Sequence, residues 1–164
     1  MLNLLESPWD DLTHPVVVLI EDSDEDFYTF LRIAGKLCKE EKIPAPYNLL
    51  RFEDGDEALD YLLREGEYES LDAALPAAIL LDLNLPGTDG REIIKSIKQT
   101  PKLRMLPIVV LTTSRSPHDI QSCYEYGANS YILKPMGISE MQETVKVLFK
   151  YWFQLTLLPS YGQF

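Results

Sequence analysis

Residues 77–90, AAILLDLNLPGTDG, contain the pattern from which the fold can be predicted. A short apolar run, Ala77–Leu81, ends at Asp82, and a turn with Pro, Gly and Asp leads into a helical stretch that starts at Arg91. Uninterrupted apolar runs of this length are typical of parallel strands that are covered on both faces. The same succession of apolar run, polar turn and helical stretch occurs along the rest of the chain.

Five predicted strands alternate with five predicted helices. The strands are Val16–Ile20, Asn48–Phe52, Ala77–Leu81, Ile108–Leu111 and Tyr131–Leu133. The helices are Glu25–Lys42, Glu57–Arg64, Arg91–Lys98, Pro117–Tyr126 and Ser139–Phe153. Four helices have a start signal, which in chain order is Asp54 or Gly55, Asp89, Ser116-Pro117 and Ser139. The alternation predicts an α/β fold, a doubly wound sheet of five parallel strands in the flavodoxin-like order 2-1-3-4-5, with functional residues at the carboxyl edge.

Composition and charge exclude several classes of protein. A chain of 164 residues can bury one good core but is short for two domains. The net charge of −11 would repel a phosphate backbone, so we expect no direct nucleic-acid binding. No window approaches eighteen consecutive apolar residues, so we expect no membrane span. The two cysteines lie far apart and the start of the chain lacks a signal-peptide pattern, which predicts a reduced, cytoplasmic protein.

We expect three segments: an arm over 1–14, one globular domain over 15–153 and a tail over 154–164. The last helix has four aromatic residues that cannot all face one stripe, because consecutive residues lie about 100° apart. They are Phe149, Tyr151, Trp152 and Phe153. Two explanations stay open. These residues pack beneath the tail or the arm, or they form the contact of a homodimer built around the last helix, which we favour because exposed apolar patches usually mark contacts.

Charged and hydroxyl side chains follow four of the five predicted strands. Glu21 and Asp22 follow the first, Asp82 the third, Thr112 the fourth and Lys134 the fifth. Because parallel strands end at one edge of a sheet, we expect these side chains to converge on one small cleft.

Three neighbouring carboxylates repel one another, and a hard cation relieves the repulsion. Mg²⁺ prefers oxygen ligands and commonly bridges carboxylates to a phosphate group. A carboxylate beside Mg²⁺ can also attack phosphorus and form an acyl phosphate. In that chemistry Lys134 and Mg²⁺ would neutralise charge on the transferring phosphoryl oxygens, and Thr112 would donate a hydrogen bond to one of them.

Taken together, these residues resemble the receiver domains of bacterial two-component response regulators. The resemblance covers roughly Val16 to Phe149, and 15–153 would be the receiver domain. It rests on Glu21-Asp22, on Asp82-Leu83-Asn84-Leu85-Pro86 followed by Asp89-Gly90, on Thr112, on Tyr131 and on Lys134-Pro135.

The resemblance implies a role for each metal-site residue. Asp82 would accept the phosphoryl group. Asp22 and Asp82 would bind Mg²⁺ directly, Glu21 would act on metal-bound water, and the backbone carbonyl of Asn84 would complete the protein ligands.

The resemblance also implies a conformational switch. Thr112 and Tyr131 would form the switch pair, in which the hydroxyl moves toward the phosphoryl group and the ring turns inward. Lys134 would pair with the acyl phosphate, and the Lys134–Pro135 bond would be cis.

More narrowly, three features are similar to small regulators paired with cyanobacterial phytochromes. They are the long connection Glu65–Pro76, the segment LLDLNLPGTDGREI over residues 80–93, and the tail with Trp152 and Leu158-Pro159-Ser160. The resemblance implies a sensor histidine kinase of the phytochrome type as the partner. It also implies that the protein is not an enzyme, and that its only reactions are self-phosphorylation from a donor and slow autodephosphorylation.

Other polar residues have ordinary structural explanations. Glu25 and Asp26 suit the first turn of a helix, where acidic residues favour the dipole, and we assign them no role. His14 and His118 have no neighbouring partner in the sequence for metal or relay chemistry. Cys38 and Cys123 fall within helical patterns and are expected to be small core residues.

Three other functions are alternatives to signalling by phosphorylation. An aspartyl-phosphate phosphohydrolase would use the same Asp, Mg²⁺ and Lys on small phosphate esters, but it would need an acid where Asn84 stands. A pseudo-receiver scaffold would be expected to have lost one of the acidic or switch residues, and all are present. A flavin carrier would need a neutral phosphate-binding turn after the first strand, where Glu21-Asp22-Ser23-Asp24 stand.

Overall fold

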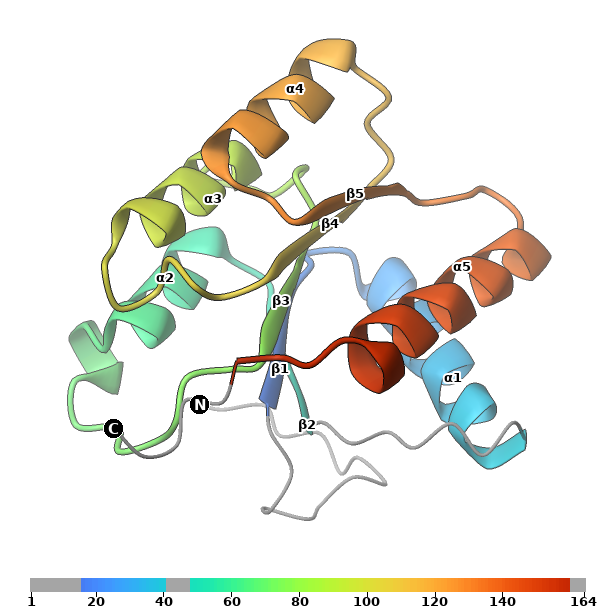
Figure 1. Ribbon diagram of the computed structural model, residues 1–164, viewed down its shortest axis with the longest axis horizontal. Helices are drawn as coiled ribbons and strands as arrows, with labels where there is room; N and C mark the ends of the chain where they lie inside the picture. Colours follow the sequence, from blue (N-terminus) through green and yellow to red (C-terminus); the bar gives the residue numbers. More distant parts are fainter. Residues whose placement is uncertain (1–15, 41–47, 160–164) are drawn as a thin grey trace.

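The computed structural model describes residues 16–40 and 48–159, which form a five-stranded parallel sheet with helices on both faces (Figure 1). The strands are β1 (Val16–Ile20), β2 (Asn48–Phe52), β3 (Ala78–Leu81), β4 (Ile108–Thr112) and β5 (Ser130–Leu133). Their order is β2-β1-β3-β4-β5, and every neighbouring pair is parallel. The predicted fold class and strand order are confirmed.

The helices occupy the predicted connections. They are α1 (Asp24–Glu40), α2 (Gly55–Leu63), α3 (Gly90–Gln99), α4 (Pro117–Tyr126) and α5 (Ile138–Lys150). A short 3₁₀ turn, η1 (Gly66–Tyr68), follows α2, and a π-helical turn, η2 (Tyr151–Leu155), follows α5. In Figure 1, α1 and α5 cover one face of the sheet and α2, α3 and α4 cover the other. None of the described helices is long and apolar enough to cross a membrane.

Three of the four predicted helix starts are N-caps. The side chains of Asp54, Asp89 and Ser116 each accept a hydrogen bond from a backbone N–H in the first turn of α2, α3 and α4. The prediction that Ser139 caps the last helix is wrong, because α5 begins at Ile138 and its N-cap is Gly137. Ser139 is already helical and therefore cannot take the extended conformation of an N-cap.

The neighbouring strands β1 and β3 bury both faces, because alternate residues point to opposite sides of the sheet. Val18, Ile20, Ile79 and Leu81 belong to the core beneath α2, α3 and α4. Their sequence neighbours belong to the core beneath α1 and α5: Val17, Leu19, Ala78 and Leu80. This double burial explains why β1 and β3 are uninterrupted apolar runs.

The aromatic residues at the end of α5 are packed mostly within the chain. Phe149, Trp152 and Phe153 are each 8% exposed and belong to the core beneath α1 and α5, against which Leu158 also packs. Only Tyr151 is largely exposed, at 55%. The π-helical turn changes the angle between successive side chains, which lets the neighbours Trp152 and Phe153 both face inward. The exposed aromatic surface is therefore smaller than the helical pattern predicts.

The predicted arm over 1–14, with His14, lies outside the described residues, as does the end of the tail from residue 160. The segment boundaries at 15 and 153 stay predictions.

Candidate functional site

The site is built where β1 and β3 end side by side. Ile20 is paired with Leu81 in the register of these two strands, so the next residues, Glu21 and Asp82, emerge at the same level. The backbone N–H of Asp82 donates to the carbonyl of Ile20 at 3.0 Å, which extends the pairing to the site itself. Both acidic side chains are buried, with Glu21 3% and Asp82 5% exposed.

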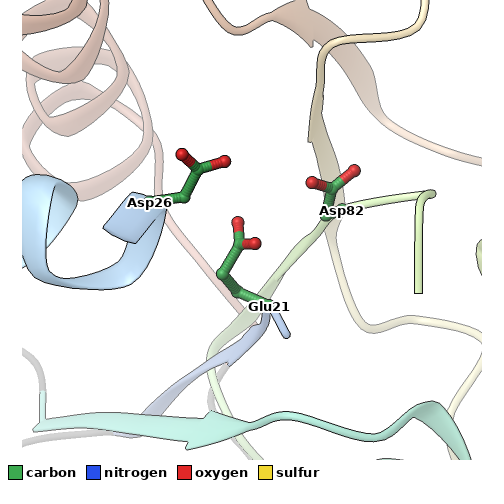
Figure 2. A group of neighbouring side chains, drawn as sticks. All are labelled: Glu21, Asp26 and Asp82. Carbon is green, nitrogen blue, oxygen red and sulfur yellow. The ribbon is translucent and has the colours of Figure 1, made fainter. Parts of the chain in front are cut away.

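Lys134, which follows β5, lies among three carboxylates. Its ammonium nitrogen is 2.6 Å from Asp82 Oδ2, 2.6 Å from Glu21 Oε2 and 2.7 Å from Asp26 Oδ2. One oxygen from each of the three acidic residues lies within 4.8 Å of the other two. Figure 2 shows the three carboxylates turned toward a common space, with Asp26 on α1 and the other two at the ends of strands. The structure thus brings together residues that are up to 113 positions apart.

Burial and the shared ammonium shift the pKa values of these groups in different directions. Burial favours the neutral acid of Asp82, but hydrogen bonds from Lys134 and from the backbone N–H of Asn84 outweigh it and hold the pKa of Asp82 below its usual value. Burial raises the pKa of Glu21 in spite of its contact with Lys134. Burial would lower the pKa of Lys134, but its hydrogen bonds to Asp26, Asp82 and Glu21 raise it above the ordinary lysine value. At neutral pH, Asp82 is therefore an ionised carboxylate beside a permanent ammonium.

The donor set suits a hard divalent cation. All three acidic groups offer carboxylate oxygens, which Mg²⁺ prefers, and one ammonium cannot neutralise three carboxylates. Burial and, to a smaller extent, the neighbouring Asp82 carboxylate raise the pKa of Glu21. The cluster thus has the chemistry of a Mg²⁺ site.

The other predicted ligands differ in how close they lie to the three carboxylates. Asp22 has an exposed side chain and is not part of the group of three carboxylates. The backbone N–H of Asn84 donates to Asp82 Oδ1 at 3.0 Å, so Asn84 lies at the rim beside the expected acceptor. The assignment of Asp22 and of the Asn84 carbonyl as ligands stays a prediction.

Thr112 is placed where the sequence predicts it. It ends β4, is fully buried, and its hydroxyl is among the groups that lower the pKa of Asp82 by hydrogen bonding. Thr112 Oγ1 also accepts a hydrogen bond from the side-chain amide of Asn84 at 3.3 Å. The hydroxyl is thus within reach of a group transferred to Asp82.

Tyr131 is connected to the loop between β4 and α4. Its hydroxyl donates to the carbonyl of Ser114 at 3.0 Å, and the ring is half-buried against the core. The Ser114 hydroxyl donates to Asp119 at 2.6 Å, and Asp119 accepts from Arg91 of α3 at 2.6 Å. Arg91 also donates to Asp89, the N-cap of α3. A chain of hydrogen bonds therefore links Tyr131 to the start of α3 and α4.

The predicted cis bond before Pro135 is absent. No peptide bond in the described part of the chain is cis, so the Lys134–Pro135 bond is trans. The trans form is the more stable one for most X–Pro bonds, by about 0.5–1 kcal/mol.

Asp26 is a site residue that was not predicted from the sequence. It was assigned to a solvated first turn, but its carboxylate reaches Lys134. A signal was present: Phe30, Ile33 and Leu37 are buried on α1, and Asp26 lies one turn before Phe30 on the same stripe. A carboxylate at the head of a buried stripe faces the sheet, so the helical period could have separated Asp26 from the exposed Glu25.

Comparison with known proteins identifies the family. The sequence matches the response regulator receiver domain family over residues 17–146. It is 37% identical over 145 residues to the response regulator Rcp1 of Synechocystis sp., covering 88% of this chain and 93% of Rcp1. It is 38% identical over 146 residues to the probable methanogenesis regulatory protein FilR2 of Methanothrix harundinacea, covering 88% of each chain.

Solved structures agree with this match. The phosphorylated cyanobacterial phytochrome response regulator RcpA superposes with a TM-score of 0.78 at 38% identity, over 90% of this chain and 99% of RcpA. The Mn²⁺-bound form of Rcp1 superposes with a TM-score of 0.79 at 36% identity, over 89% of this chain and 99% of that chain. Sequence, strand order and the acidic site thus agree, and the chain belongs to the response regulator receiver domain family.

Proposed function

We propose that Asp82 accepts a phosphoryl group from a phosphohistidine of a sensor histidine kinase, in a reaction that needs Mg²⁺. Receiver domains are signalling proteins that interact with histidine kinases. The observation that carries the proposal is the buried Asp82 carboxylate, held 2.6 Å from Lys134 within a group of three acidic residues. Rcp1, a relative, has been solved with Mn²⁺ bound, and RcpA has been solved phosphorylated.

The chemical step forms one bond and breaks one. A carboxylate oxygen of Asp82 attacks phosphorus and forms an O–P bond, while the P–N bond to the kinase histidine breaks and the imidazole leaves with its electron pair. The lowered pKa of Asp82 keeps the attacking oxygen ionised at neutral pH. Lys134 is close enough to neutralise charge on the phosphoryl oxygens, and the buried Thr112 hydroxyl can donate to one of them.

The residues that would hold Mg²⁺ are Glu21, Asp82, Asp22 and the carbonyl of Asn84. When bound, the ion would neutralise negative charge between the carboxylates and the incoming phosphoryl group. Glu21 and Asp82 already face each other, and Asp22 would join them by a rotation of its exposed side chain.

The signal would leave the site through Thr112 and Tyr131. A hydroxyl that turns toward a phosphoryl group on Asp82 gives up its bond to Asn84. Ser114, whose N–H donates to Thr112 Oγ1 at 3.4 Å, also accepts from Tyr131. Movement of Thr112 would therefore change the loop that holds Tyr131, and with it the face made by α4, β5 and α5.

We propose a phytochrome-type kinase as the partner, in the cytoplasm. RcpA is described as a cyanobacterial phytochrome response regulator, and Cys38 and Cys123 are free thiols, as in proteins of reducing compartments. FilR2 is equally similar and is named for methanogenesis, so the partner needs its own test. Transfer from a phosphorylated phytochrome kinase should be much faster than from an unrelated histidine kinase, and equal rates would contradict this assignment.

We further propose a homodimer through the last helix. Val147 and Tyr151 are 56% and 55% exposed and, with Ile132 and Trp152, line a groove of about 390 Å³ between β5 and α5. A second copy could cover this groove, since β5 is an edge strand. Sedimentation equilibrium should give a dimer for the wild type and a monomer for Val147→Asp, and a wild-type monomer would contradict the dimer.

The receiver function is tested by incubating the protein with acetyl phosphate and measuring intact mass. We expect one phosphoryl adduct that requires Mg²⁺, is lost in Asp82→Asn and persists in Asp72→Asn, a control at an exposed aspartate outside the cluster. No adduct in the wild type would favour the scaffold. Turnover of a chromogenic phosphate ester much faster than loss of the adduct would favour the phosphohydrolase.

A further inference from the structure

The side chain of Arg51 on β2 donates hydrogen bonds to the backbone of the turn that carries two of the expected metal-site carboxylates. This side chain is only 8% exposed, which is unusual for a guanidinium. Nε donates to the carbonyl of Glu21 at 2.9 Å, and Nη2 donates to the carbonyl of Asp22 at 3.2 Å. The two contacts hold consecutive peptide units with two N–H groups on one edge of the planar guanidinium.

Other contacts fix the guanidinium in place. It lies over the ring of Phe27, 4.4 Å from the centroid, and Nη1 pairs with Asp24 at 2.6 Å and with Glu53 at 3.3 Å. Phe27 is a buried residue of α1, so the guanidinium lies against the hydrophobic core. The two carboxylates balance the charge of Arg51, so its contribution to the turn is mainly one of geometry.

The turn needs such a restraint because of its sequence. Glu21, Asp22 and Asp24 place three acidic residues within four positions, and their mutual repulsion favours open conformations. Inside the turn, the side chains of Glu21 and Ser23 accept hydrogen bonds from the N–H groups of Ser23 and Asp26, at 3.1 and 3.2 Å. Only Arg51 ties the carbonyls of residues 21 and 22 to another strand by a side chain, among the hydrogen bonds that the structure describes.

We propose that Arg51 is a positioning residue that preorganises the Glu21–Asp22 turn for Mg²⁺. A carbonyl direction fixes the backbone dihedrals on both sides of it, and these set where the Glu21 and Asp22 side chains can reach. Residues behind a metal site typically change metal affinity in this way. The inference rests on the proposed function, because it assumes that the acidic cluster binds Mg²⁺.

The sign of the effect separates this role from a simple charge effect. A nearby positive charge repels Mg²⁺, so its removal would strengthen binding if Arg51 acted only through its charge. If Arg51 acts by holding the turn, its removal weakens binding. Arg51→Lys keeps the charge but loses the fork that reaches two carbonyls, so it should also bind Mg²⁺ more weakly than the wild type.

The experiment measures binding of Mn²⁺ by electron paramagnetic resonance and of Mg²⁺ by competition, without any phosphoryl donor. The variants are Arg51→Ala, Arg51→Lys and Asp82→Asn. The matched control is Arg64→Ala, since Arg64 also donates to a backbone carbonyl, that of Ala73 at 2.8 Å, and stacks on Tyr61, but lies at the end of α2.

We expect Arg51→Ala to weaken Mg²⁺ binding by about tenfold or more. Arg51→Lys should fall between it and the wild type, and Arg64→Ala should match the wild type. If Arg51→Ala does not fold, Arg51→Lys decides the question. Wild-type or tighter affinity in the Arg51 variants would overturn the role of Arg51 and leave the receiver function standing. Absence of binding in the wild type, or unchanged binding in Asp82→Asn, would overturn the metal site itself.

Discussion

Removing the ammonium of Lys134 should strongly destabilise the metal-free protein. Lys134→Met keeps the apolar stem but leaves the carboxylates of Glu21, Asp26 and Asp82, which approach within 4.8 Å, without a cation. Two unit charges at that separation repel by about 3 kcal/mol at an effective dielectric constant of 20. Protonating one carboxyl at pH 7 instead costs about 4 kcal/mol. Either way, the variant should lose about 3–5 kcal/mol, as is common when one partner of a buried ion pair is removed.

Urea denaturation at pH 7 with a chelator measures this loss as a change in the free energy of unfolding. The matched control is Lys95→Met, because Lys95 pairs with Glu92 at 3.5 Å on the exposed surface of α3. It should change stability by less than about 0.5 kcal/mol. Added Mg²⁺ should restore part of the loss in Lys134→Met by taking over the role of the missing positive charge.

The pH dependence has a defined sign. The pKa of Asp82 is lower in the folded state, so its ion pair contributes stability that is present above the unfolded pKa of about 4 and is lost as the pH falls through the folded pKa. The difference between wild type and Lys134→Met should therefore shrink below pH 4. If Lys134→Met were as stable at pH 7 as Lys95→Met, the idea that Lys134 neutralises ionised carboxylates around the buried Asp82 would be refuted.

Two other features of the structure make separate predictions. Gly90→Ala would place a methyl group 2.7 Å from the Cα of Leu83 and should lower the free energy of unfolding in urea by about 1–3 kcal/mol. The control Gly35→Ala, in the middle of α1 with nothing within 4 Å, should be neutral or stabilising. Equal effects of the two variants would contradict the tight approach of α3 to the loop after β3. Burial raises the pKa of the fully buried Cys123 to about 11, so a thiol reagent should modify the half-buried Cys38 first in the folded protein. Mass spectrometry measures the rate of modification at each cysteine, and faster modification of Cys123 would contradict its burial.

The fold could be predicted because its signals are local and agree with one another. The central strands β1 and β3 are buried on both faces and lack polar residues, and three N-caps mark helix starts by side-chain type. The boundary of α5 could not be predicted in the same way. The N-cap is Gly137, which has an extended backbone and no capping side chain. By side-chain type, Ser139 two residues later is the stronger N-cap candidate, so the sequence pointed to the wrong start.

The site could be predicted only in part, because hydrogen bonds across long sequence distances have no local pattern. Glu21, Asp82 and Lys134 converge because they all follow strands of one parallel sheet. The contact of Asp26 with Lys134 depends on how α1 lies over the end of β1. The hydrogen bonds from Arg51 to the turn after β1 depend on the pairing of β2 with β1. Arg51 lies between the apolar residues Leu50 and Phe52 of β2. This position was a visible signal, but its hydrogen-bond partners become evident only from the pairing of β2 with β1.

Trapping the acyl phosphate tests most directly which carboxylate accepts the phosphoryl group. The protein is incubated with acetyl phosphate and Mg²⁺ and then reduced with borohydride, which converts an aspartyl phosphate to homoserine with loss of phosphate. Tandem mass spectrometry of the digested protein should find homoserine at position 82 and intact acids at Glu21 and Asp26. Reduction at Glu21 or Asp26 with Asp82 unchanged, or no reduction at any of the three, would contradict the assignment of Asp82 as the phosphoryl acceptor.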